Sequence, residues 1–394
     1  MSSAAPLIAL VAGEASGDNL GAALIEALRA RVPGARFVGI AGPRMRDAGC
    51  EALASSDELA LMGLAEIISE LPRLLALRRR LISSLRDRRP DVFIGIDAPE
   101  FNLRLAAELK AAGIPTVQYV SPQVWAWRPG RVRGIAAACD RILCLLPFEP
   151  DFYARHGVEA RFVGHPLADE FPLEADRLKA RDALGLDATV GSPQEVVAIL
   201  PGSRLGEVAR LAAPFAGAAA WLAARRPGVR FVAPLTTAAT RARFEIEWAR
   251  VAPEIPVTVL EGRPTPARLA LAAADVALVA SGTATLETLL SQRPMVVAYR
   301  LAPLTAFLLR RFALVKVEHF AQPNLLVGRG VVPEFFQERA TPEALGAALL
   351  AWLEQPQRIA ELQQEFSAVH RILRRGGAGL AAEAVLELLR ERAA

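Results

Sequence analysis

Short apolar runs alternate with longer amphipathic stretches along most of the chain. In the first half, runs that predict strands lie at residues 7–12, 37–41, 92–96, 116–120, 142–146 and 161–164. The segments between them, such as Asn19–Arg31 and Asn102–Ala112, predict helices. Regular alternation of this kind favours a parallel sheet with helices on both of its faces.

The second half repeats the pattern, with apolar runs at residues 196–200, 231–235, 257–260, 276–280 and 295–298. Between the halves lies His165–Asp176, a segment rich in proline and acidic residues that we interpret as an interdomain hinge. We expect domains of residues 1–167 and 168–364, with helices of about residues 365–394 packing back on the first domain or exchanged with a second copy. Two successive doubly wound α/β domains are the architecture of GT-B glycosyltransferases and of some sugar-nucleotide epimerases.

Four short motifs of polar residues, glycine or proline directly follow predicted strands, two in each half. They occupy residues 13–18, 97–102, 201–204 and 281–283. Ligands of open α/β sheets bind at the carboxyl ends of the strands. The sequence therefore predicts a site to which both domains contribute.

The two motifs of the second half suit a diphosphate. Ser281-Gly282-Thr283 stands between a strand and a helix, where free N–H groups and the helix dipole attract anions. Arg204 can neutralise phosphate in a forked geometry, and Glu287 can accept hydrogen bonds from ribose hydroxyls. The alternative is an ordinary helix cap at Ser281 with a solvated glutamate.

The motifs of the first half suit a different ligand. Glycines 13, 17 and 21 are spaced G-x3-G-x3-G rather than G-x-G-x-x-G, which disfavours a nicotinamide dinucleotide. The Gly13–Asp18 loop offers N–H donors, a hydroxyl and carboxylates, as a phosphorylated or polyhydroxy ligand requires. The alternative is a glycine turn with Asp18 as a helix cap. Asp97 ends a strand, where partial desolvation favours proton acceptance, unless it caps the helix that follows.

Composition limits the remaining classes. No run of about 18 uncharged apolar residues predicts a transmembrane helix. The N-terminal residues do not resemble a signal segment. Three cysteines cannot form a disulfide framework, so we expect a reducing, cytoplasmic setting without zinc. There is no D-x-D motif, which is consistent with a mechanism that uses no metal.

Net charge is only +4, but seven arginines and one acid lie between Arg73 and Arg89. Met62–Arg89 and Leu301–Val317 each combine apolar residues with basic ones. Either stretch can be a core-facing helix with a solvated face. Their occurrence together favours contact with an anionic bilayer.

Eight motifs together resemble the lipid-A-disaccharide synthase family, in order from residue 11 to beyond residue 320. They occupy residues 11–18, 95–102, 119–128, 146–149, 162–167, 200–204, 280–284 and 323–325. The resemblance implies an inverting GT-B enzyme of lipid A biosynthesis in a Gram-negative cell. It would join UDP-2,3-diacylglucosamine to 2,3-diacylglucosamine 1-phosphate through a β(1→6) bond and release UDP without a cofactor. Members are similar in forming a dimer with a swapped C-terminal segment.

This interpretation assigns roles to individual residues. Asp97 is the expected base. The donor would be held by Arg204, Ser281, Gly282, Thr283, Glu287 and Asn324. The acceptor would be held by Glu14, Ser16, Gly17, Asn102, Trp127 and Arg128, with the arginine near its 1-phosphate.

We expect a peripheral protein on the cytoplasmic face of the inner membrane, with no nucleic-acid partner. Two alternatives remain. One is another UDP-GlcNAc-dependent GT-B enzyme, either a transferase to a different lipid acceptor or an epimerase. The other is a peripheral membrane protein that binds UDP-sugars without turnover.

Overall fold

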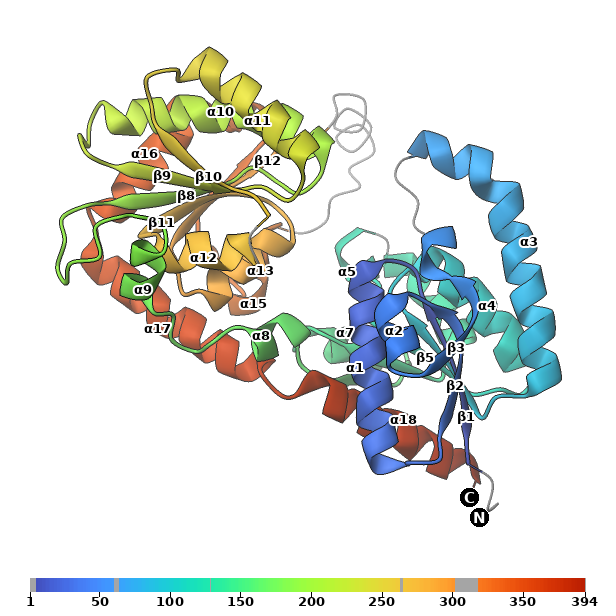
Figure 1. Ribbon diagram of the computed structural model, residues 1–394. Coiled ribbons are helices and arrows are strands. Elements are labelled where there is room, and N and C mark those ends of the chain that lie inside the picture. The colour runs from blue at the N-terminus through green and yellow to red at the C-terminus, as the bar shows by residue number, and fades with distance from the viewer. Residues whose placement is uncertain (1–4, 60–63, 128, 263–264, 302–317, 394) are drawn as a thin grey trace. The chain divides into compact units, whose positions relative to one another are not determined.

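A computed structural model describes residues 5–59, 64–127, 129–262, 265–301 and 318–393 (Figure 1). The chain forms two compact units. Unit 1 consists of residues 1–169 and 373–394, and unit 2 of residues 170–372. Unit 2 is therefore continuous in sequence, whereas unit 1 is completed by a segment that follows unit 2.

Unit 1 contains a parallel sheet of seven strands in the order β3-β2-β1-β4-β5-β6-β7. The strands are β1 (Leu7–Ala12), β2 (Arg36–Ala41), β3 (Cys50–Ser55), β4 (Val92–Ile96), β5 (Thr116–Tyr119), β6 (Arg141–Cys144) and β7 (Ala160–Phe162). The order of connection reverses between β1 and β4, which pair directly, with Ala12 opposite Ile96. Such a reversal opens a crevice at the carboxyl ends of the two strands.

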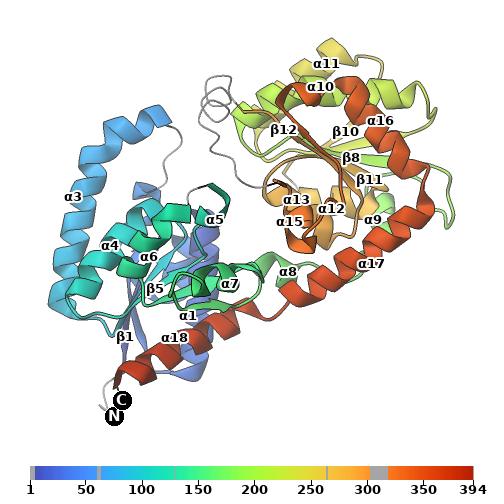
Figure 2. The ribbon, with the colours of Figure 1, turned by 180° about the vertical axis from the view of Figure 1, so that it is seen from behind.

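Helices cover both faces of this sheet (Figures 1 and 2). One apolar core lies under α1 (Ala15–Arg31), α2 (Pro43–Asp47) and α18 (Gly377–Ala393). The core on the other face lies under α3 (Leu64–Arg88), α4 (Pro99–Ala111) and α6 (Val132–Ala138). The shorter helices are α5 (Val124–Trp127), α7 (Glu149–Ala154) and, at the boundary with unit 2, α8 (Pro166–Glu170).

The helix α18 is an integral part of unit 1. Ala381, Val385 and Leu388 are buried in the same core as α1. The fully buried Arg141 guanidinium on β6 donates to the Ala384 carbonyl at 2.5 Å and to the Glu391 carboxylate at 2.9 Å. A segment that follows unit 2 thus supplies part of the unit 1 core.

Unit 2 has a parallel six-stranded sheet in the order β10-β9-β8-β11-β12-β13. Its strands are β8 (Val196–Leu200), β9 (Arg230–Pro234), β10 (Val257–Leu260), β11 (Val276–Ala280), β12 (Met295–Tyr299) and β13 (Glu334–Phe336). Its helices are α9 (Arg177–Asp182), α10 (Leu205–Ala223), α11 (Ala238–Val251), α12 (Pro266–Ala273), α13 (Thr283–Leu290), α15 (Gln322–Val327), α16 (Pro342–Leu353) and α17 (Pro356–Leu373). The reversal here lies between β8 and β11.

The structure differs from the sequence-based expectations in three elements. The strands β3 and β13 were not predicted, and both are edge strands, where one flank is unpaired and the apolar signal is weak. The helix α1 begins at Ala15 rather than Asn19, so Ser16 and Gly17 belong to a first helical turn instead of a loop. In the described part of the chain, no helix combines the length and apolarity needed to cross a bilayer.

Candidate functional site

A cavity of about 230 Å³ lies in unit 2 at the carboxyl ends of β8 and β11. Val279 pairs with Leu200, so the residues that follow the two strands lie side by side. Predicted site residues that line the cavity are Arg204, Ser281, Gly282, Thr283 and Glu287. The structure thus brings together most of the expected donor residues within one unit.

Two helices of ordinary length begin at this cavity, α10 at Leu205 and α13 at Thr283. The first N–H groups of a helix have no partner within it, and the helix dipole is positive there. Gly282 has a φ of 148°, a conformation that favours glycine, and a Cβ at this position would point into open space. The turn therefore leaves the start of α13 accessible to an anion.

Glu207, which is not among the predicted site residues, organises the loop before α10. Its Oε2 accepts from the backbone N–H groups of Ser203 at 3.1 Å and Arg204 at 3.3 Å. A Cβ on Gly202 would lie 2.6 Å from Glu207 Cβ, so the loop requires glycine there. Because Glu207 already occupies these amides, the loop can attract an anion chiefly through Arg204, whose side chain is 80% exposed. Glu207 lies three residues after Arg204, the N-cap of α10, which is the spacing of a capping box. This spacing is the sequence signal by which Glu207 can be recognised.

Glu287 lies one turn into α13, on the wall of the cavity. Burial raises the pKa of its carboxyl group, and nearby Arg268 opposes that rise. A half-buried carboxylate on the cavity wall is suited to accept hydrogen bonds from hydroxyl groups of a ligand.

Asn324 does not line this cavity. Its amide nitrogen donates to the Val332 carbonyl at 2.9 Å and to Glu334 Oε1 at 2.7 Å. Its oxygen accepts from the N–H groups of Val331 and Val332. The side chain is 1% exposed, so in this structure it fixes the loop between α15 and β13.

Asp97 stands at the switch point of unit 1, directly after β4. Asp97 and Ala98 both adopt positive φ, 52° and 40°, which is costly for residues other than glycine. Within the described residues, no side chain bonds to the Asp97 carboxylate, which is half-exposed. The strained turn therefore presents a carboxylate that is available to a ligand.

Two buried amides support this turn through its backbone. Asn102 Nδ2 donates to the Asp97 carbonyl at 2.9 Å, and Gln118 Nε2 donates to the same oxygen at 3.0 Å. Gly95 leaves room for both, because a Cβ there would lie 2.8 Å from Asn102 Cβ and 2.9 Å from Gln118 Oε1. Asn102 is fully buried, so in this structure it holds the backbone of Asp97 and does not face a ligand. No motif in the sequence points to Gln118, because it lies within an apolar strand.

The start of α1 lies beside Asp97. A Cβ on Gly13 would come within 2.9 Å of Ala98 Cβ, which shows how closely the two loops approach. Glu14 and Ser16 are exposed at the first turn of α1, whereas Gly17 is buried.

Asp18, in the same motif, has a structural role. It caps α2 rather than α1, since its carboxylate accepts from the N–H groups of Gly42, Arg44 and Met45. Asp18 is thus a helix cap, as the alternative interpretation of this loop expected, but the helix that it caps is α2.

A buried carboxyl group anchors the aromatic segment that follows β5. Glu149 Oε1 accepts from Ser121 Oγ at 2.7 Å and from the Trp125 indole at 3.2 Å. Its Oε2 accepts from the Leu146 N–H at 3.0 Å, and burial raises the pKa of the group. Residues 124–127 of this segment are helical as α5. Trp127 lies in α5, and Arg128 lies outside the described residues.

Solved structures with this fold include sugar-nucleotide enzymes. UDP-GlcNAc 2-epimerase from Neisseria meningitidis aligns with a TM-score of 0.59 and 14% identity, covering 98% of this chain and 100% of that one. MurG from Acinetobacter baumannii aligns with a TM-score of 0.59 and 13% identity, covering 97% and 99%. The fold is that of the GT-B class, as the sequence predicted.

Sequence comparison narrows the class to one family. The model of the lipid-A-disaccharide synthetase family matches residues 8–385. The lipid-A-disaccharide synthase of Alkalilimnicola ehrlichii is 54% identical over 96% of this chain and 97% of its own length. That of Pseudomonas aeruginosa is 51% identical over 98% of both chains. The chain belongs to the lipid-A-disaccharide synthetase family, and the resemblance stated from its motifs is confirmed.

Proposed function

We propose that this protein is a hexosyltransferase that joins UDP-2,3-diacylglucosamine to 2,3-diacylglucosamine 1-phosphate. The products are the β(1→6) disaccharide 1-phosphate and UDP. Membership of the family supports the reaction. The observation that carries it is the unit 2 cavity, where the start of α13, Arg204 and Glu287 suit a nucleoside diphosphate.

The reaction inverts the donor's anomeric carbon. The acceptor 6-hydroxyl oxygen attacks C1, its proton passes to the Asp97 carboxylate, and the bond between C1 and the diphosphate oxygen breaks. Charge then grows on the departing UDP, where the start of α13 and Arg204 stabilise it. Glu287 accepts from the ribose hydroxyls, and no metal takes part.

The acceptor binds beside Asp97, against the first turn of α1 that exposes Glu14 and Ser16. Gly17, Trp127 and Arg128 extend this subsite, with Arg128 at the 1-phosphate. Asn102 contributes by holding the Asp97 turn, since its side chain is fully buried. Asn324 contributes to the donor side by fixing the loop that precedes β13.

The acylated substrates place the protein at a lipid surface, which we take to be the cytoplasmic face of the inner membrane. Residues 1–167 form the part that receives the acceptor, and residues 168–364 the part that binds the UDP-sugar. Exchange of the α18 segment between two copies would give a homodimer.

A product assay tests the proposal. Purified protein is incubated with both acylated sugars, and the products are identified by mass spectrometry together with released UDP. We expect a disaccharide 1-phosphate that requires both substrates. Absence of this product under conditions in which the protein is folded and binds UDP would refute the assignment.

Two further arms separate the alternatives. Unacylated UDP-GlcNAc as donor tests for a transferase of different specificity, and its conversion without any acceptor tests for an epimerase. A protein that binds UDP-sugars without turnover would release no UDP in the presence of both substrates.

A further inference from the structure

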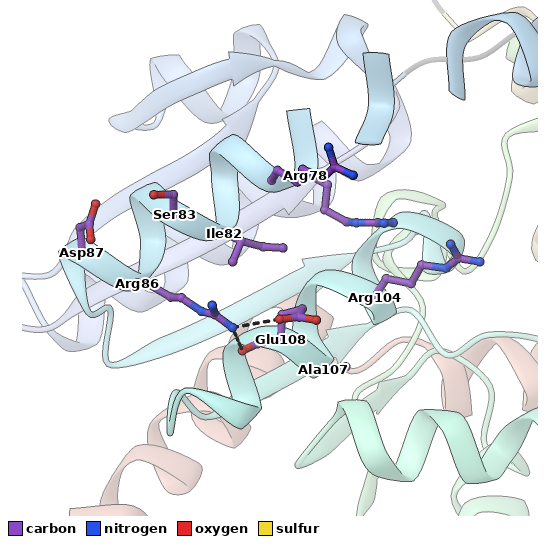
Figure 3. Close-up of a pocket in the computed structure, with 9 residues that line it drawn as sticks. Arg78, Ile82, Ser83, Arg86, Asp87, Arg104, Ala107 and Glu108 are labelled. Atoms are coloured by element: carbon purple, nitrogen blue, oxygen red, sulfur yellow. Dashed lines mark hydrogen bonds and ion pairs between the residues drawn. The ribbon is translucent and has the colours of Figure 1, made fainter. Parts of the chain in front are cut away.

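A groove of about 740 Å³ lies between α3 and α4 on the surface of unit 1. The helix α3 contributes Arg78, Arg79 and Arg86 to its lining, and α4 contributes Arg104. Figure 3 shows Arg78 and Arg86 on one side and Arg104 on the other. In the sequence, the arginines of residues 73–89 form one cluster. The structure divides them, and it adds Arg104 from a separate helix.

The arginines of α3 fall into two groups. Arg86 donates to Glu108 Oε2 at 2.9 Å and is therefore neutralised within the groove (Figure 3). Arg80 and Arg88 pair with Glu58 and Glu51.

Arg78, Arg79 and Arg104 differ from these. Among the described residues, no carboxylate forms an ion pair with any of the three. Burial and, after it, the neighbouring guanidiniums of Arg104 and Arg79 lower the pKa of Arg78, while Glu108 opposes this, so Arg78 lies in a crowded cationic environment. An anion bound between the three cations would balance this positive charge.

An exposed leucine lies on the same helix as two of these cations. Leu71 is 48% exposed and precedes Arg78 by two helical turns, so both lie on one face of α3, about 10 Å apart along its axis. The polar layer on each side of a bilayer is about 5–8 Å deep. A lipid surface offers anionic phosphate and hydrocarbon at comparable spacing, whereas a nucleic acid or free phosphate offers only the anion.

We propose that this groove is a binding site for the phosphate of an anionic membrane lipid, held by Arg78, Arg79 and Arg104 while Leu71 enters the hydrocarbon. The site rests on the proposed function only in that lipid substrates require a membrane surface. It lies outside the machinery assigned to the transfer reaction.

Vesicle sedimentation tests the site with the full chain. The variant Arg78→Gln/Arg104→Gln is compared with Arg80→Gln/Arg88→Gln, which removes the same charge from outside the groove. On vesicles of phosphatidylcholine with phosphatidylglycerol, we expect the groove variant to bind about thirtyfold more weakly. The matched control should change binding less than about threefold, because its arginines are already paired. Equal losses in the two variants, or no loss in either, would overturn the proposal.

Two single variants keep the test valid if the double variants do not fold. Arg79→Gln and Arg80→Gln are neighbours at the same level of α3, one in the groove and one outside it. We expect about a fivefold loss of binding for Arg79→Gln alone. A greater loss for Arg80→Gln would contradict the assignment.

Other ligands give different outcomes. Inorganic phosphate that saturates the groove by calorimetry and abolishes vesicle binding beyond the effect of equal ionic strength would identify free phosphate as the ligand. Loss of single-stranded DNA binding in the groove variant, with vesicle binding intact, would point to a nucleic acid. Either result overturns the proposal.

An activity arm separates this site from the proposed function. With substrates dispersed in detergent, the groove variant should turn over at the wild-type rate. If wild-type protein makes no disaccharide, the proposed function fails, while the vesicle measurements still decide the groove.

Discussion

At the scale of single residues, the unit 1 site depends on the turn at Asp97 and Ala98, which is stabilised by side chains from outside the turn. Asp97 and Ala98 adopt positive φ, and two amides hold the Asp97 carbonyl from behind. Within the described residues, the oxygens of these amides, Asn102 Oδ1 and Gln118 Oε1, are buried without a partner. Buried polar groups left without a partner are uncommon in folded proteins. The energy stored at this turn is consistent with a carboxylate fixed for one task.

Replacing Asp97 by asparagine tests that task. The amide keeps the shape of the side chain but cannot take the proton of the acceptor hydroxyl. We expect turnover to fall at least about a hundredfold, because a positioned base contributes about 10²–10⁴ in rate. Thermal unfolding should be nearly unchanged. Near-normal turnover in this variant would exclude Asp97 as the base.

Gln118 supports the turn of the proposed base, Asp97, through a hydrogen bond to its carbonyl. In Gln118→Met, the chain length remains but the hydrogen bond to the Asp97 carbonyl is lost. We expect kcat to fall about tenfold or more, since small displacements of reacting groups are costly. The KM for the donor should not change.

A control for Gln118→Met lies on the same strand. Thr116→Val removes a buried hydroxyl that donates to the Ala138 carbonyl at 2.8 Å. Both variants should lose about 1 kcal/mol of unfolding free energy. An equal fall of kcat in both would show that strand stability, not the Asp97 turn, is responsible.

The raised pKa of Glu287 leads to a prediction of how donor binding depends on pH. Burial raises the pKa of this carboxyl group, so it takes up a proton at higher pH than an exposed glutamate does. The protonated form accepts hydrogen bonds poorly, and UDP binding should weaken as pH falls through the raised pKa. Calorimetry across pH measures this. In Glu287→Gln, affinity should be about tenfold lower, and this component of the pH dependence should vanish; a retained slope would assign it to another group.

At the scale of elements, the sequence predicted what depends on local periodicity. Central strands such as β1, β4 and β11 match their apolar runs because they are buried throughout. The edge strand β3 was not recognised because only Cys50 and Ala54 are buried in it, while Glu51 and Ala52 are exposed. For the candidate site, strand-end motifs identified Arg204, Ser281 and Asp97. Gln118 could not be recognised, because its amide acts on a neighbouring strand.

Glu149 couples two elements, the start of α7 and the segment leading into α5. Glu149→Gln turns one acceptor oxygen into a donor facing the Leu146 N–H, which should cost about 1–3 kcal/mol of unfolding free energy. The cost should depend on pH. The folded pKa is raised, so the native wild-type protein binds more protons than the unfolded chain, and its stability falls as pH rises from the ordinary glutamate pKa through the raised one. Denaturant titrations should show that the difference in unfolding free energy between wild type and Glu149→Gln becomes smaller as pH rises between the two pKa values. A difference that grows would contradict the raised pKa of Glu149.

At the scale of the whole molecule, the two units are built differently. Unit 2 is one continuous segment that holds every residue lining the donor cavity. Unit 1 needs two segments, because α18 covers part of its core. Burying Val385 and Leu388 contributes about 1.5–3 kcal/mol each, and their removal would expose the core beside α1.

Residues 170–372 should therefore fold alone. We expect this segment to melt cooperatively and to bind UDP with a dissociation constant within about threefold of that of the full chain. A chain ending at residue 372 is the matched comparison. Its unit 2 should still bind UDP, while limited proteolysis should degrade unit 1. Failure of the isolated segment to bind UDP would show that the cavity needs more than unit 2.

The position of α18 also reverses the usual order of maturation during translation. Domains generally fold from the N-terminus as the ribosome extends the chain. Here residues 170–372 emerge complete while the earlier unit still lacks the helix that seals its apolar face. The apolar face that α18 covers therefore stays exposed on the first unit until roughly two hundred further residues have been synthesised.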